Sequence, residues 1–332
     1  MNDMSGYKRF AQPSRTGKFA FVLMPRFSLL ALAGTIEPLR HANHVLGEDH
    51  YSWPLFSEDG NAVLSSSGVP VSPSGSLKDV PLDANVILVG GADVLQSYSP
   101  VLVKWLRHIA VRVGMVGGLC TATRVLAEAG LLDGHRATIH WEMYESMREA
   151  FPDVELSDRL YEVDRNRMTC AGEAASTDMI LNFLMSDHGK NLAAAVAAQV
   201  LHGRVRSPEE PQAPLAIRTG IRNKYLLQAI ALMERHQDDK LDIEQIAERA
   251  GCSRRQLERL FQTKVGLPPV TYYRNLRLDR ARQLFLETDL SLMEISIACG
   301  FANSSTMSLA YKRRFGRSPT HEEKLIVVPA RA

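Results

Sequence analysis

The first two hundred residues alternate continuous apolar runs with stretches of helical periodicity. The apolar runs and the helical stretches follow one another at 18–23, 29–46, 86–89, 101–111, 114–118 and 122–129. Apolar runs of strand length that alternate with helices are typical of a parallel sheet covered on both faces. The pattern therefore predicts an α/β domain, and ligands of such domains bind at the carboxyl ends of the strands.

Beyond residue 220 the periodicity is helical throughout, and one short pattern occurs twice, at 243–261 and 292–315. In each copy an amphipathic helix ends at a glycine, Gly251 or Gly300, and a polar residue opens a second helix rich in Arg or Lys. Glycine suits the positive φ that follows a helix C-terminus. The pattern predicts two helix-turn-helix units in an all-α domain, and the second helix of such a unit enters the major groove of DNA.

The stretch between the two copies predicts a long helix over 270–286. Its apolar positions alternate with basic ones, among them Arg274 and Arg277. We expect its apolar face to pack against both units and to hold them rigidly. The two reading helices could then enter major grooves one turn of DNA apart, ~34 Å.

A proline-rich segment separates the two regions. Pro208, Pro211 and Pro214 fall within seven residues. Proline fixes φ and lacks a backbone donor, so this stretch cannot continue a helix and is typical of an extended linker. We expect an N-terminal domain over 17–206, a linker over 207–220 and a C-terminal domain over 221–324.

Length and composition agree with two packed domains. The chain has 332 residues, of which 45% are hydrophobic, enough for two cores. No apolar run approaches the ~20 residues that span a bilayer, and residues 1–18 lack the apolar region of a signal peptide. We expect a soluble, cytoplasmic protein without a membrane partner.

The cysteines and histidines form no familiar metal-binding pattern. The four cysteines are scattered without a CxxC pair, at Cys120, Cys170, Cys252 and Cys299. Disulfides and structural zinc are therefore not expected. His41 and His44 lie three residues apart on a predicted helix, which can place both on one face, but no third ligand follows at a suggestive spacing. We predict neither a metal site nor a cofactor.

Positive charge is concentrated in the region of the repeated pattern. Residues 216–324 contain 19 Lys and Arg against 13 Asp and Glu, whereas the rest of the chain has an acidic excess that brings the net charge to +2. Basic residues clustered on the second helices are what contact with DNA phosphates requires.

The second helix of each unit supplies the candidate DNA-binding residues. In the first unit Ser253 can cap the helix, with Gln256 completing a capping box. Arginine can read guanine, glutamine can read adenine, and neighbouring basic residues hold phosphates. The candidates are Ser253, Arg254, Arg255, Gln256 and Arg259 in the first unit, and Asn303, Ser304, Ser305, Thr306, Lys312, Arg313 and Arg314 in the second.

The segment Gly117–Arg124 places Cys120 between a short strand and a helix. A sharp turn there would expose the Cys120 sulfur beside a helix N-terminus, where the dipole favours a thiolate or a bound anion. The competing interpretation is that Cys120 is a small, buried hydrophobic residue.

The run GGLCTATRVLAEAGLLDGHRATIHW, 117–141, resembles the elbow region of the ThiJ/PfpI group within the class I glutamine amidotransferase-like fold. Residues 221–324 resemble an AraC/XylS DNA-binding domain, with RLDRARQLF, 277–285, in the connecting helix. Together the two resemblances cover nearly all of the chain, in the order found in GlxA-type regulators. They imply a flavodoxin-like α/β domain followed by an all-α DNA-binding domain.

The resemblance also implies a function. Some GlxA-type regulators respond to small nitrogenous metabolites such as arginine, betaine or carnitine. We therefore expect a transcription regulator, acting as an activator, whose partners are double-stranded promoter DNA, a small-molecule effector, RNA polymerase and a second copy of the chain. An effector could bind at the strand ends through Glu37, Cys120, Thr121, His140, Trp141 and Glu142.

Simpler explanations compete with this assignment: Trp141 as a core residue, Glu142 as an acid in the first turn of a helix, and Glu37 on a solvated helix face. Catalysis is the weaker alternative, because hydrolytic members of the group carry a histidine where this chain has Thr121 and a glutamate near the apolar stretch 29–33. We therefore assign no catalytic residue. The remaining alternatives are a thiol-based redox sensor at Cys120 and a retained Cys-dependent amidase or peptidase activity.

The two copies of the pattern are unequal. Relatives of the AraC/XylS family often have an aromatic residue where this chain has Met307 and a basic residue where it has Leu309. We expect weaker base readout by the second unit, with phosphate contacts from its basic end, and we expect the first unit to dominate sequence specificity.

Overall fold

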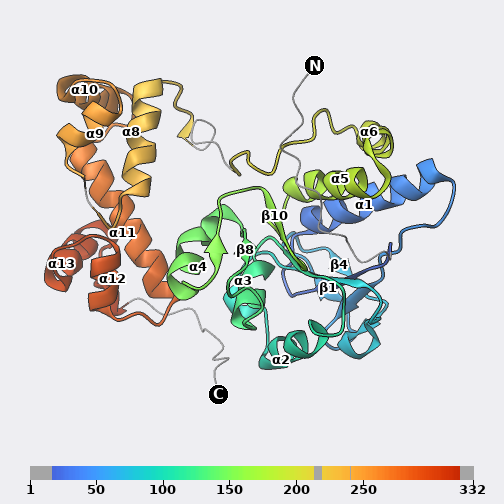
Figure 1. Cartoon of the computed structure of the whole chain (residues 1–332). Coiled ribbons are helices and arrows are strands. Elements are labelled where there is room, and N and C mark those ends of the chain that lie inside the picture. The colour runs from blue at the N-terminus through green and yellow to red at the C-terminus, as the bar shows by residue number, and fades with distance from the viewer. Residues whose placement is uncertain (1–16, 213–218, 240, 322–332) are drawn as a thin grey trace. The chain divides into compact units, whose positions relative to one another are not determined.

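A computed structural model describes residues 17–212, 219–239 and 241–321 (Figure 1). Contacts within the chain divide it into two compact units after Gln212. In the described residues no helix is long and apolar enough to cross a membrane.

The first unit is built on a seven-stranded sheet in the order β10-β11-β7-β6-β1-β2-β5. Neighbouring strands are parallel except for the pair β10 and β11. The strands are β1 Phe19–Leu23, β2 Leu55–Ser57, β5 Gly75–Ser76, β6 Asn85–Val89, β7 Val116–Leu119, β10 Tyr161–Asp164 and β11 Arg167–Cys170. Every residue of β1 and β6 is buried, which is why these strands are continuous apolar runs rather than alternating ones.

Helices cover both faces of this sheet. The helices are α1 Leu29–Leu46, α2 Pro100–Ile109, α3 Ala122–Glu128, α4 Tyr144–Ala150, α5 Ala175–His188 and α6 Lys190–Gln199. Figure 1 shows α1, α5 and α6 together on one side of the sheet and α2 and α3 on the other. The core on the first side includes Phe19, Leu39 and Met179, all fully buried. The predicted flavodoxin-like α/β domain is confirmed.

Short elements decorate the sheet. They are the two-stranded sheets β3 Val63–Leu64 with β4 Pro70–Val71 and β8 Arg136–Ala137 with β9 Glu155–Leu156, and the 3-10 helices η1 Leu77–Asp79, η2 Val94–Gln96 and η3 Trp141–Met143.

The second unit is entirely helical. Its helices are α8 Lys224–Arg235, α9 Ile243–Arg249, α10 Arg254–Lys264, α11 Pro269–Glu287, α12 Leu292–Ala298, α13 Ser304–Phe315 and η4 Pro319–His321. The turns α9–α10 and α12–α13 contain Gly251 with φ +77° and Gly300 with φ +63°, as the repeated pattern predicts. Two hydrophobic clusters, one under each turn, include Phe261 and Tyr311. The predicted double helix-turn-helix domain is confirmed.

The connecting helix α11 holds both helix-turn-helix units of this second unit through two side chains one helical turn apart. The hydroxyl of Tyr273 donates to the backbone carbonyl of His236 at the end of α8. The Arg277 guanidinium donates to the carbonyls of Cys299, at 2.6 Å, and Gly300 in the second turn. Because Arg277 is only 5% exposed, these carbonyls replace the water that its charge would otherwise need.

The expected linker starts later in the structure than its prolines suggest. Residues 207–212 bond to the first unit: Leu160 N–H donates to the Pro208 carbonyl, and the Gln212 amide donates to the carbonyls of Ile139 and Arg159. Contacts within the chain accordingly group residues 207–212 with the first unit. Proline lacks a backbone donor but keeps its carbonyl as an acceptor, so a proline-rich stretch can still dock.

The packing of Gly300 yields a prediction with an internal control. A Cβ added to Gly300 would lie 2.6 Å from the carbonyl oxygens of both Gln237 and Asp238, whereas a Cβ on Gly316, with φ +78°, would meet nothing within 4 Å. Both replacements force a side chain into the left-handed region, at about 1–2 kcal/mol. Gly300→Ala should destabilise the second unit by about 1–3 kcal/mol more than Gly316→Ala, because of overpacking. Calorimetry of the full chain measures both, and equal losses would contradict the proposed contact.

Candidate DNA interface and effector pocket

The first reading helix, α10, presents its basic residues to solvent. Ser253 caps it by accepting a hydrogen bond from the Gln256 N–H at 3.3 Å, while complete capping boxes open α9 and α12 instead. Arg254, Arg255 and Arg259 are exposed. Leu257 and Phe261 are fully buried. The helix thus turns one stripe to the core and leaves its basic stripe open for a groove.

Arg254 differs from its neighbours because it already has carboxylate partners. Its Nε donates to Glu258 Oε1 at 2.9 Å, and its Nη1 lies 3.8 Å from Glu244 Oε2. Arg255 and Arg259 have no ion-pair partner within the described part of the chain. A base or phosphate that takes Arg254 must therefore displace Glu258, whereas Arg255 and Arg259 can bind DNA directly.

The second reading helix, α13, is capped at its start by Asn303. The Asn303 carboxamide oxygen accepts from both the N–H and the hydroxyl of Thr306, at 2.8 and 2.9 Å. These two predicted contact residues therefore hold each other. Ser305 is exposed and Ser304 half-buried, so the start of α13 remains accessible beside the cap.

One expectation for α13 needs correction. Met307 is fully buried in the cluster with Tyr311, so it fills the core and cannot contribute to base readout. Leu309 is 56% exposed and keeps its place on the open face. Residues 307 and 311 are one helical turn apart on the same stripe, and their packing in the structure identifies that stripe as the core side.

Arg314, expected to anchor phosphate, is instead bound to α11. Its guanidinium donates to both carboxylate oxygens of Asp279, with the closest contact at 2.6 Å. Such a bidentate pair orients both side chains, so Arg314 ties α13 to the connecting helix. Lys312 and Arg313 are exposed, and they remain the basic residues of this helix end that are open to phosphate.

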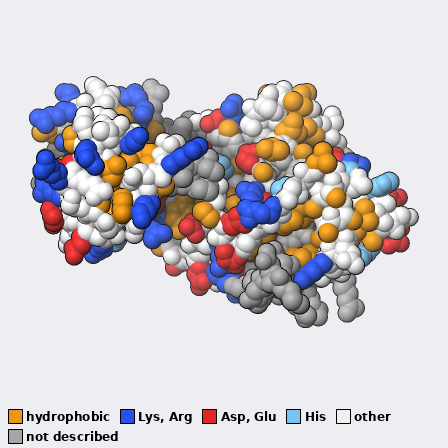
Figure 2. Space-filling model, turned by 90° about the horizontal axis from the view of Figure 1, so that it is seen from above, with side chains coloured by type: hydrophobic (Ala, Val, Ile, Leu, Met, Phe, Trp, Pro, Cys, Tyr) orange, Lys and Arg blue, Asp and Glu red, His pale blue; other side chains and the backbone are white. Residues whose placement is uncertain are grey.

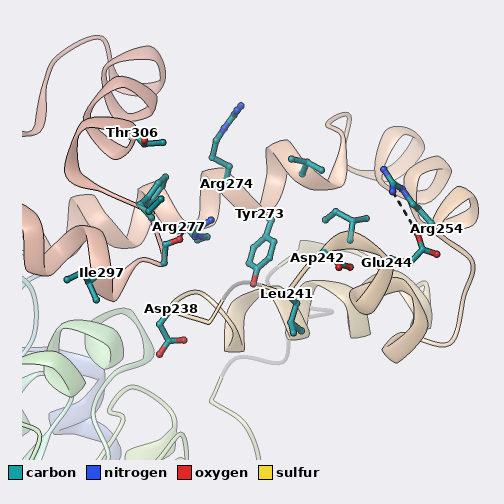
Figure 3. A pocket seen from close by; sticks show the side chains of 15 residues that line it. Asp238, Leu241, Asp242, Glu244, Arg254, Tyr273, Arg274, Arg277, Ile297 and Thr306 are labelled. Carbon is teal, nitrogen blue, oxygen red and sulfur yellow. Dashed lines mark hydrogen bonds and ion pairs between the residues drawn. The ribbon is translucent and has the colours of Figure 1, made fainter.

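A groove of about 930 Å³ lies between the two helix-turn-helix units (Figure 3). Arg254, from the start of α10, and Thr306, from the start of α13, line it together with α11. Arg274 points away from α11 in this view, is exposed, and has no partner within the described residues. From the sequence, Arg274 was expected only among the basic positions of the connecting helix, not among the DNA-binding candidates. Figure 2 shows that Lys and Arg outnumber Asp and Glu on the visible face of this unit, at the left.

In the first unit Cys120 occupies a sharp turn between β7 and α3. Its φ is +58°, in the left-handed region that non-glycine residues rarely adopt. Glycines make room for this turn: a Cβ on Gly90 would lie 2.5 Å from the Ala122 nitrogen, and one on Gly172 would lie 2.6 Å from the Cys120 Cβ. The predicted strand–turn–helix elbow is confirmed.

Of the two interpretations of Cys120, the buried one is confirmed and the exposed sulfur is wrong. Cys120 is 5% exposed, and Gly172 packs against its Cα and Cβ. Burial raises the pKa of the Cys120 thiol to about 12, and the negative charge of Glu173 adds to the effect. The short helix α3 does not offset this desolvation. Thr121 is also engaged, since its hydroxyl donates to the Gly91 carbonyl at 2.7 Å.

The other predicted pocket residues are distributed unevenly. Glu37 lies on the exposed side of α1 and pairs with Arg40 at 2.7 Å. His140 is half-buried, with Nδ1 3.8 Å from Glu142 Oε2, and Trp141 is 41% exposed beside it. Glu142 is close enough to Cys120 to raise the pKa of its thiol, so His140, Trp141 and Glu142 form one rim near the elbow.

Two features of the first unit were not found from the sequence. Glu173 follows β11 and has a φ of +48°. Its negative charge raises the pKa of the Cys120 thiol more than the charge of Glu142 does. A cavity of about 510 Å³ lies at the carboxyl ends of β1 and β2, lined by Arg26, Glu58, Asp59, Tyr98 and Ser99 among others. This is the edge of an open parallel sheet where ligands usually bind. Its lining comes from three loops that only the folded sheet brings together.

Comparison with known proteins covers both units. Residues 20–186 match the DJ-1/PfpI family, and residues 246–324 match a helix-turn-helix domain family. The chain is 40% identical over 315 residues to the HTH-type transcriptional regulator CdhR of Pseudomonas aeruginosa, covering 95% of this chain and 94% of that one. It is 33% identical over 307 residues to the HTH-type transcriptional regulator GlxA of Rhizobium meliloti, covering 91% and 94%.

A solved structure agrees with the fold of the first unit. The crystal structure of an AraC family transcriptional regulator from Pseudomonas putida aligns with a TM-score of 0.50 at 24% identity, covering 55% of this chain and 98% of that one. With both domain families matched and regulators of the same length related over nearly the whole chain, the protein belongs to the GlxA-like transcriptional regulators of the AraC family, which join a DJ-1/PfpI domain to a helix-turn-helix DNA-binding domain.

Proposed function

We propose that this regulator activates transcription when a small nitrogenous metabolite, such as an amino acid or a betaine, binds its N-terminal unit. The observation that carries the DNA-binding half is the pair of capped reading helices held to one rigid connecting helix by Tyr273 and Arg277. Such a pair can occupy adjacent major grooves of one promoter. A second copy of the chain would cover a second half-site, and activation requires contact with RNA polymerase in the cytoplasm.

The chemistry of the first unit supports a cationic or zwitterionic effector. Glu58 and Asp59 line the cavity at the strand ends, and Ser99 donates to Glu58 at 2.8 Å, which orients that carboxylate. The rim near the elbow offers the Trp141 ring and the Glu142 carboxylate. Carboxylates bind ammonium and guanidinium groups, and an indole face binds quaternary ammonium groups.

Residues 206–212 offer a route from the elbow rim to the end of the first unit. The Gln212 amide donates to the carbonyl of Ile139, the residue before His140. Asp178, fully buried, accepts from the Arg206 backbone at 2.7 Å and from its guanidinium. A ligand that shifts the elbow rim therefore acts on the same segment that holds the chain just before the second unit.

The structure argues against a reactive thiol. Nucleophilic and redox cysteines act as thiolates, whereas Cys120 is buried with a raised pKa and is followed by Thr121 instead of a histidine. We therefore place no catalytic or redox step at Cys120 and treat the elbow as part of a binding domain.

DNA binding should depend on the first reading helix. Arg254→Ala combined with Arg255→Ala should weaken binding at least about 30-fold, since each arginine–guanine contact contributes about 1–3 kcal/mol. The assay is a footprint or mobility shift on a fragment that the wild-type chain selects from random sequence. Lys104→Ala with Arg112→Ala removes the same charge from exposed positions of the first unit and should bind normally. Undiminished binding by the first variant would overturn the assigned reading helix.

Effector binding should be detectable as stabilisation of the full chain. Ligand at a hundred times its Kd adds about 2.7 kcal/mol to the stability of the state that binds it. Thermal-shift screening against amino acids, betaines and polyamines should therefore find a stabilising compound. If the compound binds in the cavity, Glu58→Gln should abolish the thermal shift. If it binds at the elbow rim, Glu142→Gln should abolish the shift instead. Glu155→Gln changes an exposed residue outside both positions and serves as a control that should leave the shift unchanged. A screen without any stabilising compound would contradict the proposed effector class.

Cys120 should be unreactive in the folded chain. With a pKa near 12, its thiol stays protonated from pH 5 to pH 9. Iodoacetamide should label the half-exposed Cys252 about tenfold faster or more, and Cys120 only after unfolding. Cys120→Ser should keep the effector response. Rapid native labelling of Cys120 at pH 7, or DNA affinity that follows thiol oxidation, would favour the redox alternative.

A further inference from the structure

Three side chains far apart in the sequence meet at the surface of the first unit. His50, Asp187 and His188 each offer one ligand atom, and these atoms lie within 4.8 Å of one another. Asp187 Oδ2 is 3.5 Å from His188 Nε2 and 3.9 Å from His50 Nε2. His50 belongs to the loop between α1 and β2, whereas Asp187 and His188 end α5, so folding alone creates the cluster.

These separations suit a transition metal ion. Imidazole nitrogens and carboxylate oxygens lie about 2.0–2.2 Å from Zn²⁺, which puts neighbouring ligands of a tetrahedral site about 3.3 Å apart. The Asp187–His188 distance of 3.5 Å is close to this value, whereas the Asp187–His50 distance of 3.9 Å and the wider limit of 4.8 Å require the side chains to move inward when a metal binds. Two imidazoles and one carboxylate are also a ligand set that binds zinc and similar divalent ions.

The backbone beside His50 is fixed before any metal binds. The Asn43 side chain of α1 accepts from the Tyr51 N–H and donates to the Tyr51 carbonyl, both at 2.8 Å. On the other side the His50 carbonyl packs against Gly17, where an added Cβ would lie 2.3 Å away. A ligand on a segment held from both sides loses little entropy when a metal binds.

Neighbouring groups orient the three ligands. Tyr51, which is 2% exposed, donates its hydroxyl to Asp187 Oδ2 at 2.6 Å. Glu48 Oε1 lies 3.7 Å from His50 Nδ1 and leaves Nε2 for the site. In metal sites the second ring nitrogen of a histidine ligand usually contacts a carboxylate, and a carboxylate ligand usually accepts a hydrogen bond from a neighbouring donor.

We infer that His50, Asp187 and His188 bind one divalent transition metal ion, of the Zn²⁺ class, with water completing the coordination. The cluster is exposed, so the ion would exchange with solvent and its occupancy would follow its concentration. Bound metal would link the loop after α1 to the end of α5. The helices α1 and α5 lie side by side in the same layer (Figure 1). It would thereby stabilise the layer formed by α1 and α5, from which the chain continues into α6 and then to residues 207–212.

Among the histidines, the prediction of no metal site rested on His41 and His44 alone, the pair whose spacing is visible in the sequence. His50 and His188 are too far apart in sequence for any spacing rule. His44 is exposed in the last turn of α1, outside this cluster, and it provides the matched histidine control.

The test is a calorimetric titration of the full chain with Zn²⁺ after removal of metals with EDTA. Cys252→Ala is present throughout, to remove the half-exposed thiol as a competing ligand. We expect one Zn²⁺ per chain. His50→Ala and His188→Ala should each weaken binding about tenfold or more, Tyr51→Phe about tenfold through its effect on Asp187, and His44→Ala not at all.

Thermal unfolding supplies an independent readout. Saturating Zn²⁺ should raise the melting temperature of the parent chain and of His44→Ala but not of His188→Ala. Circular dichroism checks that each variant is folded. The inference is overturned by the absence of saturable binding, by affinity unchanged in His188→Ala, or by a loss as large in His44→Ala as in His188→Ala.

Discussion

The second unit depends on one buried cation. Arg277 loses most of its hydration when α11 packs, and burial lowers the pKa of its guanidinium, a sign of how poorly the charge is solvated there. The carbonyls of Cys299 and Gly300 and the face of Phe301, 4.3 Å from the guanidinium carbon, replace that water. Each charge-assisted hydrogen bond is worth about 1.5–3 kcal/mol. The α12–α13 turn is therefore fixed to α11 by electrostatics, and the α9–α10 turn is fixed to it by packing around Tyr273. The two reading helices thus keep one spacing.

That fixed frame separates two kinds of arginine on the reading helices. Arg314 is bidentate with Asp279 and only 28% exposed at its side chain, so releasing it to DNA would cost a well-formed pair. Arg254 and Glu258 are about half exposed, and exposed pairs of this kind contribute only about 0.2–1 kcal/mol. DNA can displace Glu258 at little expense, which leaves the first helix free to read bases while the second holds its position.

Burial periodicity is local, so the sequence was enough to predict β1, β6, β7, α1, α2, α3 and the two helix-turn-helix units, with most of their bounds; α1 begins and ends where the apolar pattern changes, and the two turns contain Gly251 and Gly300. The strands β2, β5, β10 and β11 and the helices α4, α5 and α6 were not predicted. The sequence was also not enough for features decided by distant contacts. Cys120 is covered by Gly172 from another strand end, and Arg314 meets Asp279 from another helix. A helical stripe also leaves the core or groove role of Met307 open until the packing partner is known.

The same limit explains why the sensing unit is harder to interpret than the DNA-binding unit. A reading helix is a single continuous segment, so its cap, basic stripe and core stripe are all visible in one stretch of sequence. The cavity at the strand ends takes Arg26, Glu58 and Ser99 from three separate loops, and no local pattern connects them. Gln212 is bonded to Ile139, next to His140, and does not line that cavity, so the contact that links the first unit to the chain's exit also comes from residues distant in sequence. The chemistry of the sensing unit therefore depends on contacts that folding creates, and the elbow cysteine alone does not define it.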